Sequence, residues 1–300
     1  MSRRDIVNIT TLSLIWGASF MFIRVADRQF DPWTLVWLRV LLGCVVLVPV
    51  ALSAGGRGAL RQARTAWKRL FVLGAVNTAA PFMLFAWAET RIDSSLAGIL
   101  QAAAPIFTLL LGARFAHERV GGAKLGGVLL GLAGVAVLVG VPGGGSLLAQ
   151  LAVILAAFCY ACGATFSSLK LRGTDPLVMG AGSCLFAMLL TAPLGIAHFP
   201  TEAPGWKEIA SVAVLGLVGT GVAYMILFAL LRSAGPSRAI LVTYTIPAVA
   251  VLYGTLLLDE PLRGVSVVGL ALILAGVGLA GRSRKAKRQQ VQPAPVAVPE

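Results

Sequence analysis

The side chains of this sequence that could do chemistry are polar and aromatic residues placed inside long apolar segments. In such surroundings these side chains bind small molecules through hydrogen bonds, ring contacts and charge. Eight of them are candidate binding residues: Trp16, Arg39, Asn77, Gln101, Tyr160, Tyr224, Thr243 and Tyr244. These residue types indicate reversible binding rather than bond making.

Sequence motifs that indicate catalysis are missing from the chain. It contains no G-x-S-x-G, no H-E-x-x-H, no phosphate-binding P-loop and no Cys/His set with metal-ligand spacing. Cys159 and Cys162 have a C-x-x-C spacing, but on an apolar helix these are two small residues one turn apart, without a stabilised thiolate. We therefore expect a protein that is not an enzyme and that uses neither a metal nor a cofactor.

Two prolines inside apolar segments predict helix hinges. Proline has no N–H, so the carbonyl four residues earlier loses its usual donor. Pro105 frees the carbonyl of Gln101, and Pro247 frees that of Thr243. Either a kink patched by a neighbouring helix or a substrate path along Gln101 and Thr243 is consistent with this pattern.

The aromatic and charged candidates leave further alternatives open. Trp16 and Tyr160 lie at equivalent depths, where they would face an apolar or aromatic ligand or simply pack in the core. Arg39, about two turns inside its segment, either extends to the membrane surface or faces a cavity and attracts a carboxylate. Glu89 ends its segment, where we expect a salt bridge at the rim. Without a carboxylate in mid-membrane, facilitated movement is favoured over a proton relay.

The composition identifies an integral membrane protein. Hydrophobic residues make up 58% of the chain, charged residues 12%, and the mean hydropathy is +0.87. About 20 apolar residues cross the hydrocarbon as a helix. Ten such segments can be marked, at approximately 6–25, 34–54, 70–88, 94–115, 120–141, 147–169, 176–197, 208–231, 236–258 and 264–281. This predicts an all-α membrane protein with ten transmembrane helices.

The chain also repeats itself. Residues of the first half recur 142 or 144 positions later, in these pairs: Pro105 and Pro247, Gly112 and Gly254, Glu118 and Glu260, Asp31 and Asp175, Pro32 and Pro176, Pro49 and Pro193. If each repeat has five spans, the second must be inverted. We assign residues 1–142 to the first repeat, 146–282 to the second and 283–300 to a basic tail, expected to be disordered. Inverted repeats build alternating-access carriers with a substrate site near the bilayer midplane.

The basic residues predict the orientation. With the N-terminus inside, 19 of the 25 Lys and Arg residues fall in inside loops and tails. We therefore expect both termini in the cytoplasm and the 282–288 cluster at anionic lipid headgroups. This bias explains the net charge of +13 without a nucleic-acid partner.

Several motifs together resemble the EamA type of the drug/metabolite transporter superfamily. The sequence Trp-Gly-Ala-Ser-Phe at 16–20 is similar to the family's opening W-G-x-x-F, and Arg39 to its helix-two arginine. Pro105 followed by Glu118, and Pro247 followed by Asp-Glu-Pro at 259–261, are similar to the end of each family repeat. The second half departs from the pattern: Tyr-Ala-Cys at 160–162 replaces W-G-A, and Ser183 corresponds to Arg39.

The resemblance implies two inverted five-helix repeats and export of amino acids or related metabolites across the bacterial inner membrane. It is closest to the aromatic amino acid exporter branch. We expect Trp16, Tyr160, Tyr224 and Tyr244 to form apolar walls, Asn77, Gln101 and Thr243 to supply hydrogen bonds, and Arg39 to attract a carboxylate. The expected substrates are amino acids, aromatic and other apolar ones included, moved by alternating access around a central cavity.

Other functions stay open at this point. A carrier or flippase for a nucleotide sugar, a lipid-linked sugar or another metabolite would share the fold, but a phosphate would call for more basic residues inside the spans than Arg39. A membrane enzyme and a structural subunit are further alternatives. The expected partners are the substrate and membrane lipids. The Gly-x-x-x-Gly pairs at 122–131 fit either packing within the bundle or a homodimer contact.

Overall fold

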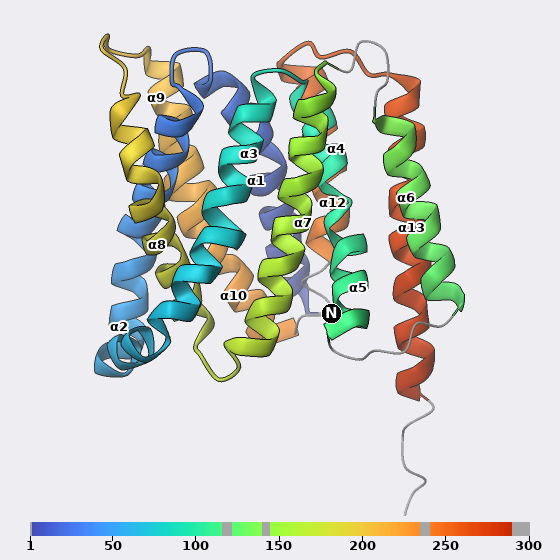
Figure 1. The fold of residues 1–300 in the computed structure, drawn as a ribbon, viewed down its shortest axis with the longest axis horizontal. Helices are drawn as coiled ribbons and strands as arrows, with labels where there is room; N and C mark the ends of the chain where they lie inside the picture. The colour runs from blue at the N-terminus through green and yellow to red at the C-terminus, as the bar shows by residue number, and fades with distance from the viewer. Residues whose placement is uncertain (1, 116–121, 140–144, 235–240, 290–300) are drawn as a thin grey trace, which may run out of the picture.

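A computed structural model describes residues 2–115, 122–139, 145–234 and 241–289. Every regular element in these ranges is a helix (Figure 1). The helices are α1 (Arg3–Ala26), α2 (Pro32–Gly74), the π-helix η1 (Ala75–Ala79), α3 (Ala80–Glu89), α4 (Ser94–Gln101), α5 (Ala104–Phe115), α6 (Gly122–Leu138), α7 (Leu147–Lys170), α8 (Pro176–Ala197), α9 (Trp206–Ala213), the π-helix η2 (Val214–Val222), α10 (Ala223–Ala234), α12 (Leu241–Leu257) and α13 (Gly264–Gln289).

The helices that open the second span of each repeat begin in the same way. The Asp31 side chain accepts a hydrogen bond from the backbone N–H of Trp33, and the Asp175 side chain accepts one from that of Leu177. In both cases a proline follows the aspartate at the first helical position, where its missing N–H costs nothing. The Asp-Pro pairs of the repeat are therefore helix start signals.

The region predicted to hold two separate spans, 34–54 and 70–88, is one helical run from Pro32 to Glu89. The chain reverses inside this run at Gly56, which has φ 49° and ψ −135° and lies outside helical geometry. Glycine adopts a positive φ without the steric cost that a Cβ brings. Figure 1 shows α2 running toward one end of the molecule and α3 returning.

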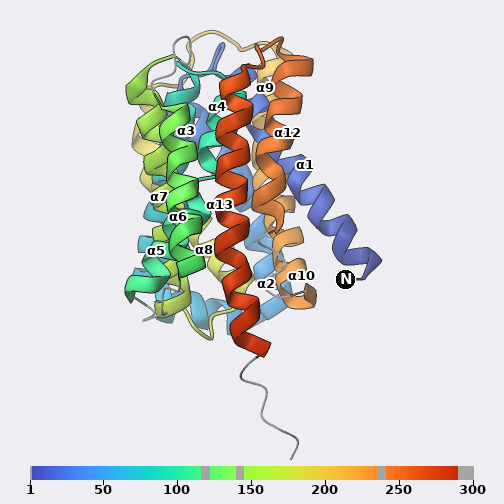
Figure 2. The same ribbon diagram turned by 90° about the vertical axis from the view of Figure 1, so that its right-hand side faces the viewer.

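By length and apolar composition, six helical runs in the described residues could cross a membrane, and three shorter apolar helices accompany them. They lie roughly side by side, with α1 tilted (Figure 2). We call the end where α1 begins and α13 ends the terminal end, and the opposite one the distal end (Figure 1). Helix α7 begins at the distal end, so the second half of the chain runs opposite to the first.

Helices α6 and α13 pack mainly against each other and stand beside the remaining helices (Figure 1). Gly134 lies against the backbone of Gly269 and Ile273, and Gly276 lies against the backbone of Gly127 and Gly131. The glycine-rich faces predicted for helix packing thus pack within the chain, at least at these positions.

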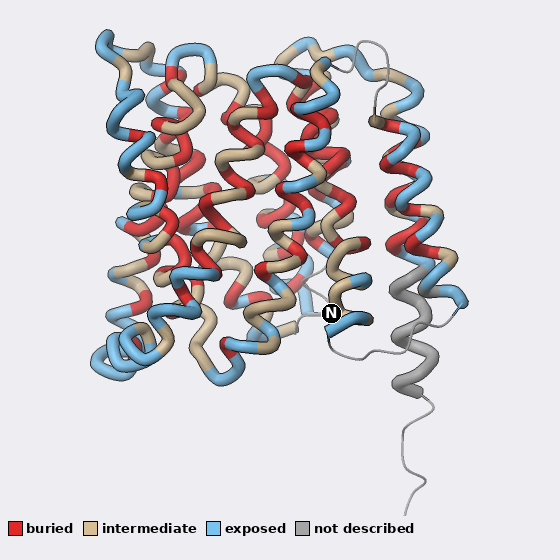
Figure 3. The backbone as a smooth tube through the Cα atoms, in the orientation of Figure 1, coloured by how far each residue is buried: buried red, intermediate tan, exposed pale blue. Residues whose placement is uncertain are grey.

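Burial follows the expectation for a chain surrounded by lipid. Buried residues line the surfaces between the helices, whereas outward surfaces are exposed (Figure 3). Large apolar side chains occupy many exposed positions, including Leu129, Leu155 and Leu256. In water such a surface would be costly, but in a bilayer it is the surface that contacts acyl chains.

The two predicted hinges differ in the structure. Helix α4 ends at Gln101 and α5 begins at Ala104, next to Pro105. Ala102 and Ala103 bridge the break, their N–H groups donating to carbonyls three residues earlier, at 3.0 and 3.1 Å. By contrast, α12 continues through Pro247 as a single helix.

The C-terminal helix is longer than predicted. Helix α13 continues to Gln289, so residues 283–289 of the predicted disordered tail are helical. The rest of that tail and Glu118, the repeat partner of Glu260, lie outside the described residues.

Candidate functional site

Arg39 points into the helix bundle. It is only 7% exposed. Its guanidinium carbon lies 4.0 Å from the centre of the Phe82 ring, and its Nε donates to the Thr220 hydroxyl at 3.2 Å. A cation over an aromatic face is attracted by the ring's quadrupole. Phe82 belongs to α3 and Thr220 to η2, so both repeats hold this guanidinium.

Trp16 and Tyr160 each pair with a different ring. The Trp16 indole N–H donates to the carbonyl of Gly219 at 3.1 Å, and its ring meets that of Tyr224 edge to face, with centres 6.4 Å apart. Tyr160 lies beside Phe85, with centres 6.2 Å apart. The two rings therefore contact different partners, although both pack against the same hydrophobic cluster.

Tyr160 and Tyr224 both pack against the hydrophobic cluster that includes Phe82, the ring beneath the Arg39 guanidinium. The buried apolar side chains form two large clusters, and Tyr160 packs against both of them. Trp16 and Tyr244 pack against one of these clusters. The structure thus brings a buried guanidinium, two phenols and an indole together. Such a group can hold an anion at the guanidinium and an apolar side chain against the rings.

The two π-helices occupy equivalent places in the two repeats. Residues 75–79 of η1 correspond, 142 positions later, to 217–221 of η2. π-helical turns are rare and are found often at functional sites. They carry Thr78 and Thr220, which are 1% and 0% exposed. Sequence reasoning missed these threonines and Phe82, although Thr78 recurs as Thr220 at the spacing of the repeat.

The predicted hydrogen-bonding residues are distributed around this group. The Asn77 side chain lies against Gly163 of α7, in the space that a Cβ at position 163 would need. Gln101 is half-buried at the end of α4, and Thr243 and Tyr244 are half-buried on α12. Helices α4 and α12 pack against each other and against α1.

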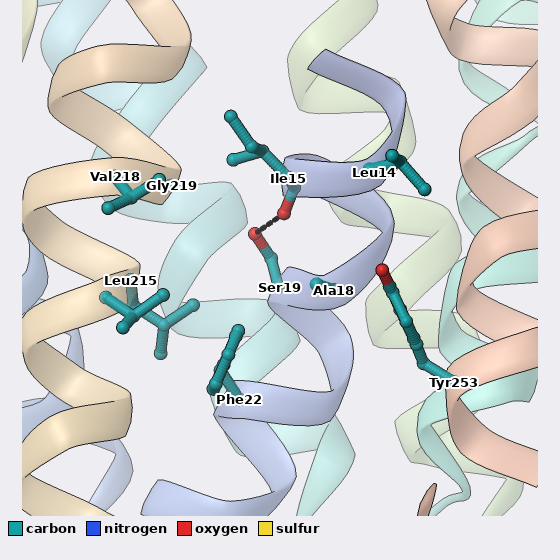
Figure 4. A pocket seen from close by; sticks show the side chains of 10 residues that line it. Leu14, Ile15, Ala18, Ser19, Phe22, Leu215, Val218, Gly219 and Tyr253 are labelled. Atoms are coloured by element: carbon teal, nitrogen blue, oxygen red, sulfur yellow. Dashed lines mark hydrogen bonds between the residues drawn. The ribbon is translucent and has the colours of Figure 1, made fainter. Parts of the chain in front are cut away.

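Two pockets open between the two repeats. The first, of about 240 Å³, lies between α1, η2 and α12. Figure 4 shows Ser19 on α1 with its hydroxyl bonded to the carbonyl of Ile15, Gly219 on the facing helix, and the Tyr253 hydroxyl directed toward α1. The second, of about 300 Å³, is lined by the end of α2, the following η1, and helices α5 and α7.

These pockets are copies of each other under the internal repeat. Seven positions that line one pocket correspond to positions that line the other: Ala18 and Cys162, Ser19 and Gly163, Phe22 and Phe166, Val72 and Val214, Leu73 and Leu215, Val76 and Val218, Leu111 and Tyr253. In each, one helix from one repeat faces two from the other. The first pocket lies toward the distal end and the second toward the terminal end.

Glu89 forms no salt bridge with any residue that the structure describes, so the expected salt bridge at the rim is wrong. Its side chain is 0% exposed, and within the described ranges neither carboxylate oxygen has a hydrogen-bond partner. Arg24 donates to the backbone carbonyl of Glu89 at 2.5 Å, and Arg91 stacks over Trp87. Helices α1 and α4 both pack against α3, which ends at Glu89, and Arg24 brings α1 to that end.

Comparison with known proteins agrees with this architecture. The model of the EamA-like transporter family matches residues 5–140 and 147–282. A probable amino-acid metabolite efflux pump of Escherichia coli is 28% identical over 92% of this chain and 94% of its own. A probable terminal-alkyne amino-acid exporter of Streptantibioticus cattleyicolor is 29% identical over 92% of each chain. A crystal structure of a protein 22% identical superposes with a TM-score of 0.68 over 97% of this chain and 100% of the other.

Proposed function

Because the chain belongs to the EamA-like transporter family, we propose that it exports amino acids across the bacterial inner membrane. Aromatic and other apolar amino acids are among the expected substrates. The protein is a multi-pass membrane transporter, and its relatives' names describe efflux pumps and exporters rather than enzymes.

The observation that carries this proposal is the buried Arg39. A guanidinium that stacks on Phe82 and uses its Nε–H for Thr220 has further N–H groups, which would bind a carboxylate in a bidentate way. The rings of Trp16, Tyr160 and Tyr224 would contact the side chain of the same substrate. An apolar wall with few polar groups accepts several side chains of similar size, which favours a broad substrate range.

We further propose ten membrane crossings and alternating access. Residues 32–89 would cross twice, because Gly56 reverses the chain. The two repeat-related pockets lie between the repeats, one toward each end. Rocking one repeat against the other would widen one pocket while it narrows its copy, which is the motion expected of inverted repeats.

Both termini would then face the cytoplasm. Basic side chains at the terminal end include Arg57, Arg61, Arg64, Lys68, Arg69, Lys170 and Arg172, whereas the distal end has Arg28, Arg91, Lys207 and Arg263. Cytoplasmic loops retain the larger share of positive charge.

Efflux from proteoliposomes tests the proposal. Vesicles containing the purified chain would be loaded with labelled L-phenylalanine and compared with vesicles containing Arg39→Gln, Trp16→Phe or Glu202→Gln. The first variant removes the cation and the second the N–H bonded to Gly219, whereas Glu202 is exposed and serves as the control.

We expect efflux from the wild type and the control, near-complete loss in Arg39→Gln and partial loss in Trp16→Phe. Efflux that Arg39→Gln leaves unchanged would exclude Arg39 as the carboxylate site. No efflux of any amino acid from wild-type vesicles would contradict the proposed function.

A further inference from the structure

Two acidic side chains near the distal end have buried carboxylate oxygens that no described residue contacts through a hydrogen bond. Asp27 ends α1 and Glu89 ends α3. Among the described residues, the buried side-chain oxygens that lack a hydrogen-bond partner belong to these two acids and Thr78. An ionised carboxylate in such a place loses its hydration and gains nothing in exchange. Each acid therefore needs a bound cation or a proton.

The charged groups around Glu89 do not provide that compensation. Those that act on it are Asp27, Glu260, Arg24 and Arg39. Arg24 is bonded to the backbone carbonyl of Glu89, and Arg39 to Phe82 and Thr220. Glu260 accepts hydrogen bonds from the backbone N–H groups of Ser94 and Ser95, at 2.8 and 2.9 Å.

Asp27 lies in a similar environment. The charged groups that act on it are Arg24 and Asp31. The Asp31 side chain already accepts a hydrogen bond from the backbone N–H of Trp33. Burial is the largest influence and raises the pKa of Asp27 to about 8. A carboxyl group in such a site exchanges its proton near neutral pH.

We propose that Glu89 and Asp27 form a site that binds a proton in one stage of transport and the ammonium group of the amino acid in another. This inference rests on the proposed function. The two occupants compete because each supplies positive charge that the buried acids lack. From the sequence, facilitated movement is favoured because no carboxylate is expected in the interior. Glu89 is buried, so that reason no longer holds.

The site is placed to communicate with Arg39. Phe85, one turn before Glu89 on α3, contacts the rings of Phe20 and Tyr160, with centres 5.7 and 6.2 Å away. Glu89 also acts electrostatically on Arg39. An α-amino acid with its carboxylate at Arg39 would direct the ammonium group on its next carbon toward Glu89, while its side chain contacts the aromatic rings.

The resulting cycle is an exchange. When the site opens to the outside, an O–H bond forms at a carboxylate and the ammonium group leaves with the amino acid. When it opens to the cytoplasm, that O–H bond breaks, the proton is released, and another ammonium group binds. A proton gradient directed inward therefore drives the amino acid outward.

The experiment measures protons and amino acid together, in full-length protein in vesicles containing labelled L-phenylalanine and a pH-sensitive dye. The variants are Glu89→Gln, Asp27→Asn and Glu89→Asp, with Glu202→Gln as the exposed control. We expect an acidic outside medium to accelerate wild-type efflux and efflux to acidify the interior. Glu89→Gln and Asp27→Asn should lose both effects and should also slow exchange of labelled for unlabelled L-phenylalanine at equal pH, because each removes a carboxylate of the ammonium site. Glu89→Asp should regain part of the acceleration.

A second measurement does not depend on transport. Infrared difference spectra between acidic and alkaline pH report the C=O band of a protonated carboxyl group, which should weaken in Glu89→Gln and in Asp27→Asn but not in Glu202→Gln. An unchanged band in both variants, or proton movement that both variants retain, would overturn the proton site. A band that depends on Glu89, together with no efflux of any amino acid, would instead reject the proposed function.

Discussion

Arg39 makes two interactions that a different cation would not reproduce. A lysine at this position keeps the charge but loses the flat stacking on Phe82 and the Nε–H bond to Thr220. A hydrogen bond to a charged group contributes about 1.5–3 kcal/mol. We therefore expect Arg39→Lys to raise the KM for L-phenylalanine about tenfold or more, with a smaller change in kcat, in vesicle efflux.

The matched control for this prediction is Phe82→Leu. It removes the ring beneath the guanidinium but leaves the bond to Thr220, and should raise KM by a smaller factor. Equal KM values for Arg39→Lys and the wild type would indicate that Arg39 acts through its charge alone.

Asp27 should make the folded protein less stable as the pH rises. Its pKa is raised from 3.8 to about 8, chiefly by burial, so between these values the folded chain holds a proton that the unfolded chain has lost. Stability is therefore highest below the unfolded value and falls as the pH rises through this window, by at most about 1.4 kcal/mol per pH unit. Thermal unfolding in detergent across this range should show a decline in the wild type that is smaller in Asp27→Asn. Parallel curves for the two proteins would contradict the shift.

At the scale of the helices, Glu260 stabilises the N-terminus of α4 through hydrogen bonds. Its carboxylate accepts bonds from the N–H of Ser94 at 2.8 Å, the Ser94 hydroxyl at 2.7 Å and the N–H of Ser95 at 2.9 Å. A negative charge at a helix N-terminus also interacts favourably with the helix dipole. We expect Glu260→Gln to lower stability by about 1.5–3 kcal/mol, measured as a drop in Tm. Glu202→Gln should leave Tm unchanged, and an equal Tm for both variants would exclude this role.

The repeat-related pockets lead to a second prediction about elements. Cys162 lines the pocket toward the terminal end, and its counterpart Ala18 lines the pocket toward the distal end. If the repeats rock, a condition that increases maleimide labelling of Cys162 should decrease labelling of Ala18→Cys, each studied as the single cysteine. Saturating L-phenylalanine on one side of the membrane is the condition to use. Changes in the same direction would contradict a rocking motion.

Much of this architecture follows from sequence patterns. The Asp-Pro pairs marked equivalent helices, the glycines marked a closely packed pair, and the apolar segments marked the spans. The hinges show where such reasoning ends: Pro105 and Pro247 are equivalent in sequence, yet only the first stands beside a break. The kink depends on whether neighbouring helices leave room for the freed carbonyl, which is a tertiary property.

Some residues of the candidate site could also be predicted from the sequence, whereas others depend on tertiary packing. Aromatic and polar residues inside apolar segments are visible in a sequence, which is how Arg39 and Trp16 were selected. Phe82 carries no such signal, because a phenylalanine in a membrane helix is ordinary. Glu89 was assigned to the rim because its position at a helix end says nothing about which neighbours cover it.

At the scale of the whole molecule, the distribution of charge makes a prediction about orientation. The described loops and helix ends at the terminal end carry more Lys and Arg than those at the distal end. Moving these charges through the hydrocarbon is costly, so the terminal end should remain in the cytoplasm. Ser53, near the terminal end, and Thr201, in the distal loop after α8, are both exposed and suit a labelling experiment.

Each would be changed to cysteine in a chain whose four natural cysteines are replaced by alanine. A membrane-impermeant maleimide should label Thr201→Cys in intact cells with a permeable outer membrane, and Ser53→Cys only after the inner membrane is opened. Labelling of Ser53→Cys in intact cells would show that the terminal end faces outward, which is the opposite of the predicted orientation. In that case the two acids would lie toward the cytoplasm, but an inward proton gradient would still drive amino acids outward, because the direction of an exchange is set by the gradients and not by the orientation of the protein.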